Sequence, residues 1–440
     1  MAAYMEEHFG HYTEQDLLDG LQAFAGGSVA AGRPLTIVDQ RGATFTDTEG
    51  REIIDCTSQA WSLNVGGCHP RVVAAASEQM RHATHVRSGF GTISKYLLSK
   101  RLTDLAPGSL KKVSYCLHGS VANEAAMKLA LRNRPGRRFF LSPWLGYAGR
   151  TFGTMAMSWP HPETKFLWYT ENVVRFPQAY CYRCPFDLTY PECGLACTKH
   201  LRRMIEHAVD GRPVALMMEP VQGGGGMIDY PPDYYPEIRR ICDDYDILLI
   251  WDEVQTAFGR VGEMFAADLY GVTPDIITFG KAIAGGFPLA GTLHRADLEG
   301  MGAGDHGFTF AHFPVAMAAA VVTLSVLQEE GLPQRAARMG ALITGRLKEL
   351  QQKYELLGDI RGPGLMIGIE LVKSRKTKEP AREETERFVD EGLRRGVLFG
   401  TSGYLGSGNV VKIKPPLVIS EAQADRVLAV FEEITALLSP

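Results

Sequence analysis

The stretch ILLIWDEVQTAFGRVGEMFAADLYGVTPDIITFGKAIAGG (residues 247–286) decides the fold class of this chain. It contains two short apolar runs, ILLIWDE (247–253) and PDIITFGK (274–281), and each run ends in charged residues. Upstream, PVALMMEP (213–220) has the same form, and PEIRRICDDYD (236–246) has the spacing of an amphipathic helix. Apolar strands that alternate with helices predict an α/β fold, with a mostly parallel sheet covered by helices on both faces.

The two ends of the chain predict a second, smaller domain. Amphipathic stretches at 334–353 and 382–395 flank the apolar run LMIGIELV (365–372), and alternating strands are expected within residues 36–58. These segments suggest a small α+β domain built from both termini. The expected boundaries are residues 1–70 for its N-terminal segment, 71–329 for the large domain and 330–440 for its C-terminal part.

Composition excludes several classes of protein. The chain has 440 residues, 45% of them hydrophobic, which argues against a mostly disordered protein. Its 46 Lys and Arg against 50 Asp and Glu give a net charge of −4, so no nucleic-acid partner is expected. No stretch approaches the ~18 uncharged apolar residues of a membrane span. The opening MAAYMEEHFG lacks the form of a secretory signal, so a cytoplasmic location is expected.

Half of the eight cysteines lie close together in CYRCPFDLTYPECGLAC, at Cys181, Cys184, Cys193 and Cys197. Four thiolates could close a tetrahedral zinc site or hold an iron–sulfur cluster. The alternative is a surface loop with free thiols, because the spacing matches no familiar zinc pattern. A metal is therefore not part of the functional prediction.

Three separate segments carry residues suited to catalysis. Lys281 stands where an apolar run meets a glycine-rich loop, a place where a lysine can be desolvated and react as a free amine with an aldehyde. Asp252 ends the preceding apolar run, where a carboxylate can pair with a pyridinium nitrogen. In LHGSVANEAAMKLAL (117–131) a Gly-Ser turn opens a helix, and the Ser120 hydroxyl and backbone N–H groups suit a phosphate.

With these three segments in this order, the chain resembles the class III pyridoxal-phosphate-dependent aminotransferases of fold type I, the ω-aminotransferase-like enzymes. The resemblance runs from about residue 50 to 420, nearly the whole chain. It is carried by HGSVANEAAMKLA, GYAGRTFG, EPVQGGGG, WDEVQTAFGRVGEMFA, DIITFGKAIAGGFPLAG, HGFTFAHFPVAMAAA, RGPGLMIGIEL and VKIKPPL.

The resemblance implies a seven-stranded, mostly parallel sheet in the large domain and pyridoxal 5′-phosphate as the cofactor. Lys281 would form the Schiff base with the cofactor and shuttle the proton, and Asp252 would hold the ring nitrogen. Thr309 would bind the phosphate in the neighbouring subunit, so a homodimer with active sites at its interface is implied. The other implied contacts are Gly119 and Ser120 to the phosphate, Tyr147 and Val254 to the two ring faces, Gln255 to the ring hydroxyl and Glu219 as a support of the pocket.

Departures from the family pattern bear on the substrate. Many members that use α-ketoglutarate have an Arg shortly before PPL and a Glu in EPVQGEGG, where this chain has Lys412 and Gly224. Lysine lacks the bidentate fork of arginine, so another grip on the substrate is one expectation. The alternative is that Lys412 points to solvent and another Arg serves. Trp61 and His312 are further candidates for substrate contact, although each could be structural.

The expected reaction is two-stage transamination between an amine or amino-acid donor and a carbonyl acceptor. The missing Glu and Arg favour an amine-rich substrate, such as an aminoglycoside or amino-sugar intermediate. A racemase or epimerase of the same family is the main alternative, with Tyr147 or a cysteine as the second acid, and a decarboxylating variant is another. A non-catalytic protein that keeps the fold is disfavoured by the intact Lys281, Asp252 and Gln255.

Overall fold

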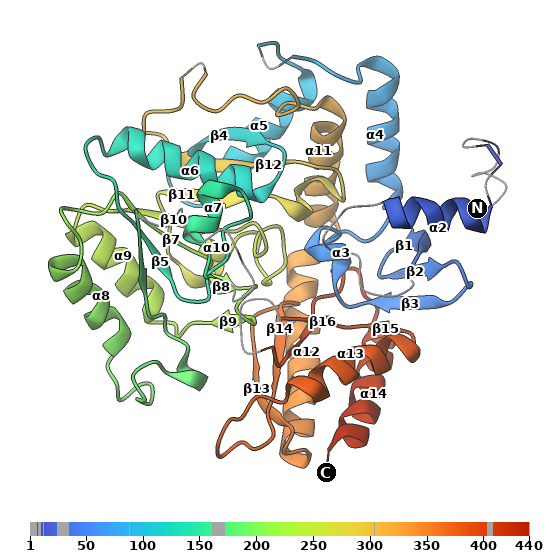
Figure 1. Cartoon of the computed structure of the whole chain (residues 1–440). Helices are drawn as coiled ribbons and strands as arrows, with labels where there is room; N and C mark the ends of the chain where they lie inside the picture. The colour runs from blue at the N-terminus through green and yellow to red at the C-terminus, as the bar shows by residue number, and fades with distance from the viewer. Residues whose placement is uncertain are drawn as a thin grey trace.

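The computed structural model describes residues 7, 10–11, 13–23, 35–87, 89–160, 172–302, 304–402 and 408–439. Figure 1 shows a large part built around a central sheet, and a smaller part in which the blue N-terminal strands lie beside the orange and red C-terminal elements. This arrangement confirms the predicted α/β fold with a small α+β domain built from both termini.

The central sheet has seven strands in the order β4-β12-β11-β10-β7-β5-β6. Neighbours from β11 to β6 are parallel, whereas β12 is antiparallel to both β11 and β4. The connection from β11 to β12 is shorter than the dozen or so residues that a parallel crossover needs, which explains the reversal. In chain order the strands are β4 (Leu110–Cys116), β5 (Phe140–Pro143), β6 (Val173–Phe176), β7 (Ala215–Met218), β10 (Leu248–Asp252), β11 (Ile276–Phe279) and β12 (Ala290–Arg295).

Both faces of this sheet are covered by helices, as β10 illustrates. Leu248 and Ile250 pack in one cluster with residues of α6, while Leu249 and Trp251 pack in another with residues of α9. Successive strand side chains point to opposite faces, so a strand buried on both sides reads as a continuous apolar run. The helices of the large part are α4 (Pro70–His82), α5 (Ile93–Leu105), α6 (Gly119–Asn133), α7 (Phe152–Met157), α8 (Ala196–His207), α9 (Tyr234–Asp244), α10 (Ala266–Tyr270) and α11 (Pro314–Glu329).

The smaller part contains two four-stranded sheets. In the first, β15 (Val397–Leu398) lies parallel to β3 (Glu52–Asp55), which joins opposite ends of the chain. The second has the order β13-β14-β17-β16. The remaining elements here are α2 (Glu14–Ala23), β1 (Ile37–Arg41), β2 (Thr44–Asp47), α3 (Ser58–Trp61), α12 (Leu332–Lys353), β13 (Leu357–Arg361), β14 (Ile367–Leu371), α13 (Arg382–Arg394), β16 (Gly400–Thr401), β17 (Val410–Ile413) and α14 (Glu421–Leu438).

The remaining short elements are a two-stranded ribbon of β8 (Val221–Gln222) and β9 (Ile228–Asp229), and the 3-10 turns η2 (Cys181–Arg183) and η3 (Lys281–Ala284). In the described part of the chain, no single helix has the length and apolar content to cross a membrane. Only α11 and α12 together meet those criteria, as a pair bent by 59°.

Candidate active site

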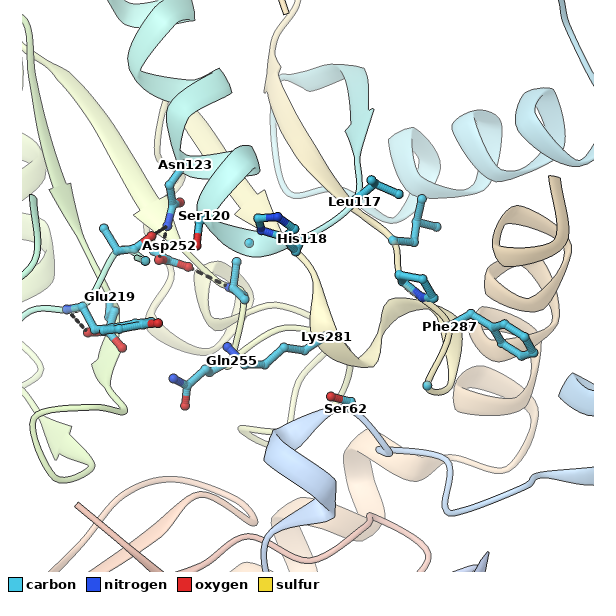
Figure 2. Close-up of a pocket in the computed structure, with 18 residues that line it drawn as sticks. Ser62, Leu117, His118, Ser120, Asn123, Glu219, Asp252, Gln255, Lys281 and Phe287 are labelled. Atoms are coloured by element: carbon cyan, nitrogen blue, oxygen red, sulfur yellow. Dashed lines mark hydrogen bonds between the residues drawn. The ribbon is translucent and has the colours of Figure 1, made fainter. Parts of the chain in front are cut away.

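A cavity of about 340 Å³ opens where the carboxyl ends of β7, β10 and β11 face the N-terminus of α6. This is the edge of an α/β sheet at which ligands bind. Figure 2 shows its labelled side chains, with Lys281 extending toward Gln255 and with Asn123 and Ser120 above Asp252. Of the predicted cofactor residues, the cavity is lined by Gly119, Ser120, Tyr147, Glu219, Asp252, Val254, Gln255 and Lys281.

Lys281 sits on a strained backbone at the floor of this cavity. It follows β11 and Gly280 and begins η3 with a φ of +48°, a left-handed conformation that side chains with a Cβ rarely adopt. Burial lowers the pKa of its amine, while the negative charges of Asp252 and Glu219 act in the opposite direction. A desolvated amine with a depressed pKa is a competent nucleophile and base.

Asp252 is a buried carboxylate that accepts hydrogen bonds from three groups. Its Oδ2 accepts a hydrogen bond from Asn123 Nδ2 at 2.6 Å, and its Oδ1 accepts from the Val254 amide at 3.0 Å and from Thr278 Oγ1 at 3.4 Å. Burial raises the pKa of Asp252, and the hydrogen bonds and Lys281 partly offset that effect. The carboxylate is therefore fixed in place and favours a cationic partner in the cavity.

Asn123 escaped the sequence analysis, although it organises this corner of the site. Its Nδ2 donates both to Asp252 and to the Ala148 carbonyl at 2.7 Å, and its Oδ1 accepts from Thr278 Oγ1 at 2.6 Å. One signal was available: Asn123 lies three residues after Ser120 in a helix, so both face the same side. An asparagine on the predicted phosphate-binding face of a helix is expected to hydrogen-bond another polar group of the site.

Glu219 links the cavity to the loop before α7. Its Oε1 accepts from the Tyr147 amide and its Oε2 from the Gly223 amide, both at 2.9 Å. Burial, followed by repulsion from Asp252, raises the pKa of Glu219 to about 8. The amide hydrogen bonds to its two oxygens partly offset this rise, and they fix the position of Tyr147.

The amino end of α6 forms a cradle for an anion. Gly119 and Ser120 begin the helix, and the preceding His118 supplies no side-chain cap, so the first N–H groups remain available to a ligand. A Cβ on Gly119 would lie 2.8 Å from Val254, and one on Gly149 would lie 2.3 Å from Ser120 Oγ. Glycine at both positions lets two loops close around the cradle, and this shape fits a phosphorylated aromatic ring.

Trp61 lies beside the cavity on a left-handed turn. The four residues of α3 (Ser58–Trp61) have φ values of 49°, 48°, 61° and 70°, and none of them is glycine. Three lysine Nζ atoms lie over the Trp61 ring, at 5.5 Å for Lys281, 5.6 Å for Lys412 and 4.5 Å for Lys414. The structure thus brings Trp61 and Lys412 close to Lys281, and it adds Lys414, which the sequence analysis missed.

Lys412 is buried, with 3% of its surface exposed, so the alternative that it points to solvent is wrong. The reason is its place on the inner strand β17, where Gly368 and Gly400 lie opposite it on the two neighbouring strands. Burial lowers the pKa of Lys412 to about 7. Its charge therefore responds to small changes in pH or to the arrival of an anion.

Thr309 and His312 lie on another surface of the single chain, away from the residues that line the cavity. Thr309 is exposed, and His312 Nδ1 lies 3.2 Å from Lys95 Nζ, with its ring edge-on to Tyr115. Large apolar side chains are exposed on the same region, including Ile93 (79%) and Phe310 (51%). This surface has the character of an interface rather than of a solvated face.

The four clustered cysteines line a separate, largely apolar cavity. All four thiols are free, and burial raises the pKa of Cys181 to about 11 and of Cys197 to about 12. Across the described residues, no group of three or more His, Cys, Asp or Glu side chains is placed to hold a metal ion. The cluster is therefore separate from the site around Lys281.

Comparisons with known proteins agree with this geometry. The family model for class III aminotransferases matches residues 28–435. A leucine/methionine racemase of Thermococcus litoralis is 36% identical over 92% of this chain and 91% of its own. The 5-aminovalerate aminotransferase DavT of Pseudomonas putida is 34% identical over 96% and 99%. An isoleucine 2-epimerase of Lentilactobacillus buchneri is 34% identical over 91% and 89%.

Solved structures give the same result. An amine transaminase from an uncultivated Pseudomonas species, in its pyridoxal-phosphate-bound form, superposes with a TM-score of 0.87 and 32% identity. The match covers 94% of this chain and 98% of that structure. The relatives thus share one fold and include both enzymes that transfer amino groups and enzymes that invert a stereocentre.

Proposed function

The chain belongs to the class III aminotransferase family of pyridoxal-phosphate-dependent enzymes, and we propose that it transfers an amino group from an amino-acid donor to a carbonyl acceptor. One observation carries the proposal: the Lys281 amine, the Asp252 carboxylate and the amino end of α6 converge on one cavity. The glycine-lined cradle and the buried carboxylate fit the phosphate and the ring of this cofactor.

Each residue around the cavity has a proposed task. When bound, the cofactor supplies an aldehyde that condenses with amines and a protonated ring that withdraws electrons. Asp252 keeps the ring nitrogen protonated, and Gly119 and Ser120 bind the phosphate. Lys281 holds the cofactor and moves the proton at the amine-bearing carbon of the substrate. Tyr147 and Val254 enclose the ring, Gln255 contacts its oxygen, and Glu219 supports Tyr147.

The charges beside Trp61 favour a substrate with a carboxylate. Lys412 and Lys414 are buried amines that are cationic when protonated, and in the described part of the chain neither makes an ion pair. Glu219 raises the pKa of Lys412 in part, and Arg361 lowers it further. A substrate carboxylate would compensate this positive field, whereas an amine-rich aminoglycoside or amino sugar would add to it. An amino acid is therefore the better candidate donor, with Lys412 as its anchor.

The second candidate is a racemase or epimerase. It is favoured by the 36% identity to a leucine/methionine racemase and the 34% identity to an isoleucine 2-epimerase. Inversion requires an acid on the face of the substrate opposite Lys281. Tyr147 is the candidate in the cavity, and no cysteine is among the residues that line it. A decarboxylating reaction would use the same cofactor grip.

A single-turnover experiment separates these reactions. The purified holoenzyme is mixed with one amino-acid donor, without acceptor, in deuterated water. Transamination predicts a keto-acid product and conversion of the bound cofactor to its amine form. Solvent deuterium that enters the donor with inversion, and without loss of its amino group, would contradict the proposal and support racemisation. A panel of donors and acceptors then defines the substrate.

A homodimer is part of the proposal. The exposed Thr309 and the exposed apolar side chains near it are explained if Thr309 of each chain completes the phosphate site of the other. Sedimentation measurements should give twice the chain mass. Thr309→Ala should weaken cofactor binding about tenfold, the usual effect of losing one hydrogen bond to a charged group. A monomer with full cofactor affinity would contradict this arrangement.

A further inference from the structure

Lys414 is a lysine with no exposed surface next to the cofactor pocket. Its Nζ donates a hydrogen bond to Gln255 Oε1 at 2.9 Å and lies 4.5 Å from the centre of the Trp61 ring. Burial lowers the pKa of Lys414 well below its ordinary value, and the neighbouring cations lower it further. Burying an amine costs folding free energy, so a buried lysine at this position suggests a functional role.

The backbone around Lys414 is held from several sides. The Lys414 amide donates to the Cys56 carbonyl at 2.9 Å, and its carbonyl accepts from Ser58 Oγ at 2.7 Å. The carbonyl of the next residue, Pro415, accepts from Arg260 Nη1 at 2.6 Å. Arg260 itself is fully buried. These hydrogen bonds fix the backbone of Lys414. They therefore also fix the point from which its side chain extends to Gln255.

The Gln255 amide is held between Lys414 and the cavity. A side-chain amide has an acceptor end and a donor end, and Lys414 Nζ donates to the Gln255 oxygen, so the acceptor end of the amide faces Lys414. Gly223 makes room for the amide, because a Cβ there would lie 2.2 Å from Gln255 Oε1. With its oxygen occupied, Gln255 presents its NH₂ group to the cavity that it lines.

We infer that Lys414 is a positioning residue that orients the Gln255 amide as a hydrogen-bond donor to the ring oxygen of the cofactor. The inference rests on the proposed function, since it assigns a cofactor ring to this cavity. A donor at the ring oxygen stabilises the anionic form of that oxygen. Such a donor therefore lowers the pKa of the enzyme-bound coenzyme, which is the midpoint of its titration with pH.

The test is a spectroscopic titration of the holoenzyme, in which the absorbance of the bound coenzyme is followed against pH. Lys414→Met leaves the Gln255 amide without its fixed partner and should raise the midpoint by about one pH unit. Gln255→Leu should raise it by a similar amount. The double variant should show no further shift, because Lys414 acts through Gln255.

Lys412→Met is the matched control. Lys412 is also a buried lysine over the Trp61 ring, at 5.6 Å, so Lys412→Met makes the same change of side chain in the same neighbourhood. The bond to Gln255 belongs to Lys414. The shift caused by Lys412→Met should therefore add to that of Gln255→Leu, whereas the Lys414→Met shift should not.

An unchanged midpoint in Lys414→Met, or a shift that adds fully to that of Gln255→Leu, overturns the inference. If Lys414→Met does not fold, Lys414→Gln retains a donor, and its midpoint should stay near that of the wild type; a midpoint moved as in Gln255→Leu overturns the inference. A protein that binds no coenzyme, with none fixed to Lys281 by borohydride, contradicts the proposed function itself. A normal holoenzyme with an unmoved midpoint contradicts only the role of Lys414.

Discussion

Two clusters of charged side chains in this molecule differ in whether their charges are paired within the protein. In the first, Arg361 Nη1 bonds to Asp359 at 2.6 Å and to Glu370 at 2.8 Å, and Glu370 also accepts from Arg183 and Tyr180. In the second, Lys281, Lys412 and Lys414 gather around Trp61, and no ion pair to these lysines occurs within the described ranges.

The difference shows in the titration of the two clusters. Burial raises the pKa of Glu370, but Arg361, Tyr180 and Arg183 outweigh it and leave that pKa below its ordinary value. Around Trp61, burial dominates and lowers the pKa of all three lysines. The charges of the first cluster are paired with one another, so this cluster stabilises the fold without a ligand. The lysines of the second cluster make no ion pair among the described residues, and an anionic ligand would provide the missing counter-charge.

The largest expected effect is at Lys281. Lys281→Ala removes the amine that both holds the cofactor and moves the proton, so turnover should fall by about 10⁴-fold or more. The cofactor should still bind, through the phosphate cradle and Asp252. Activity is measured with the best donor, and attachment by borohydride reduction and mass spectrometry. Substantial turnover by this variant would rule out a catalytic amine at this position.

The next effect concerns the first cluster. Glu370→Gln removes the carboxylate that Arg361 and Arg183 share and leaves the buried Arg361 with Asp359 alone, so it should lower the free energy of unfolding by about 3–5 kcal/mol. Urea denaturation at fixed protein concentration measures this. Glu379→Gln, at an exposed pair with Lys373, is the control and should change stability by less than about 1 kcal/mol. Equal effects of the two substitutions would contradict the distinction between the clusters.

The pH dependence tests the role of Lys412. The pKa of Lys412 is about 7, and only its protonated form attracts a carboxylate, so kcat/KM for an amino-acid donor should fall as pH rises above 7. The limit is about tenfold per pH unit. Lys412→Arg keeps its charge at every pH and should remove this decline. The same profile in both proteins would show that Lys412 does not set it.

The smallest expected effect is on stability in the second cluster. Lys414→Met replaces a buried amine by an apolar chain of similar size, so the free energy of unfolding should stay within about 1 kcal/mol of the wild type or increase. Thermal unfolding of the cofactor-free protein measures it. A loss as large as that of Glu370→Gln would mean that Lys414 serves the fold rather than the ligand.

The sequence predicted much of the large domain because its strands are buried on both faces. The apolar runs that end near Glu219, Asp252 and Lys281 form β7, β10 and β11 in the structure. These three residues line one cavity. The expected domain boundaries at residues 70 and 330, and the roles of the individual site residues, stay predictions. Lys414 could have been found, since it lies two residues after Lys412, and a period of two places both on one face of a strand.

Other features had no signal in the sequence. Nothing in Ser58–Trp61 marks a left-handed turn, because none of these residues is glycine. The turn is imposed from outside, by the hydrogen bond of Ser58 Oγ to the Lys414 carbonyl and that of Arg260 Nη2 to Ser58 Oγ. These contacts join residues 202 and 356 positions apart. Contacts at such separation are not visible as a local pattern.

The sequence by itself predicted the α/β class, the apolar runs that end near Asp252 and Lys281, and the Gly-Ser start of the helix at residue 119. Those properties follow from local periodicity and from residue types at the ends of strands. Only the tertiary structure decided that Trp61 faces three lysines and that Lys412 is buried. Burial, and the pKa shifts that follow from it, depend on what the rest of the chain packs against a residue.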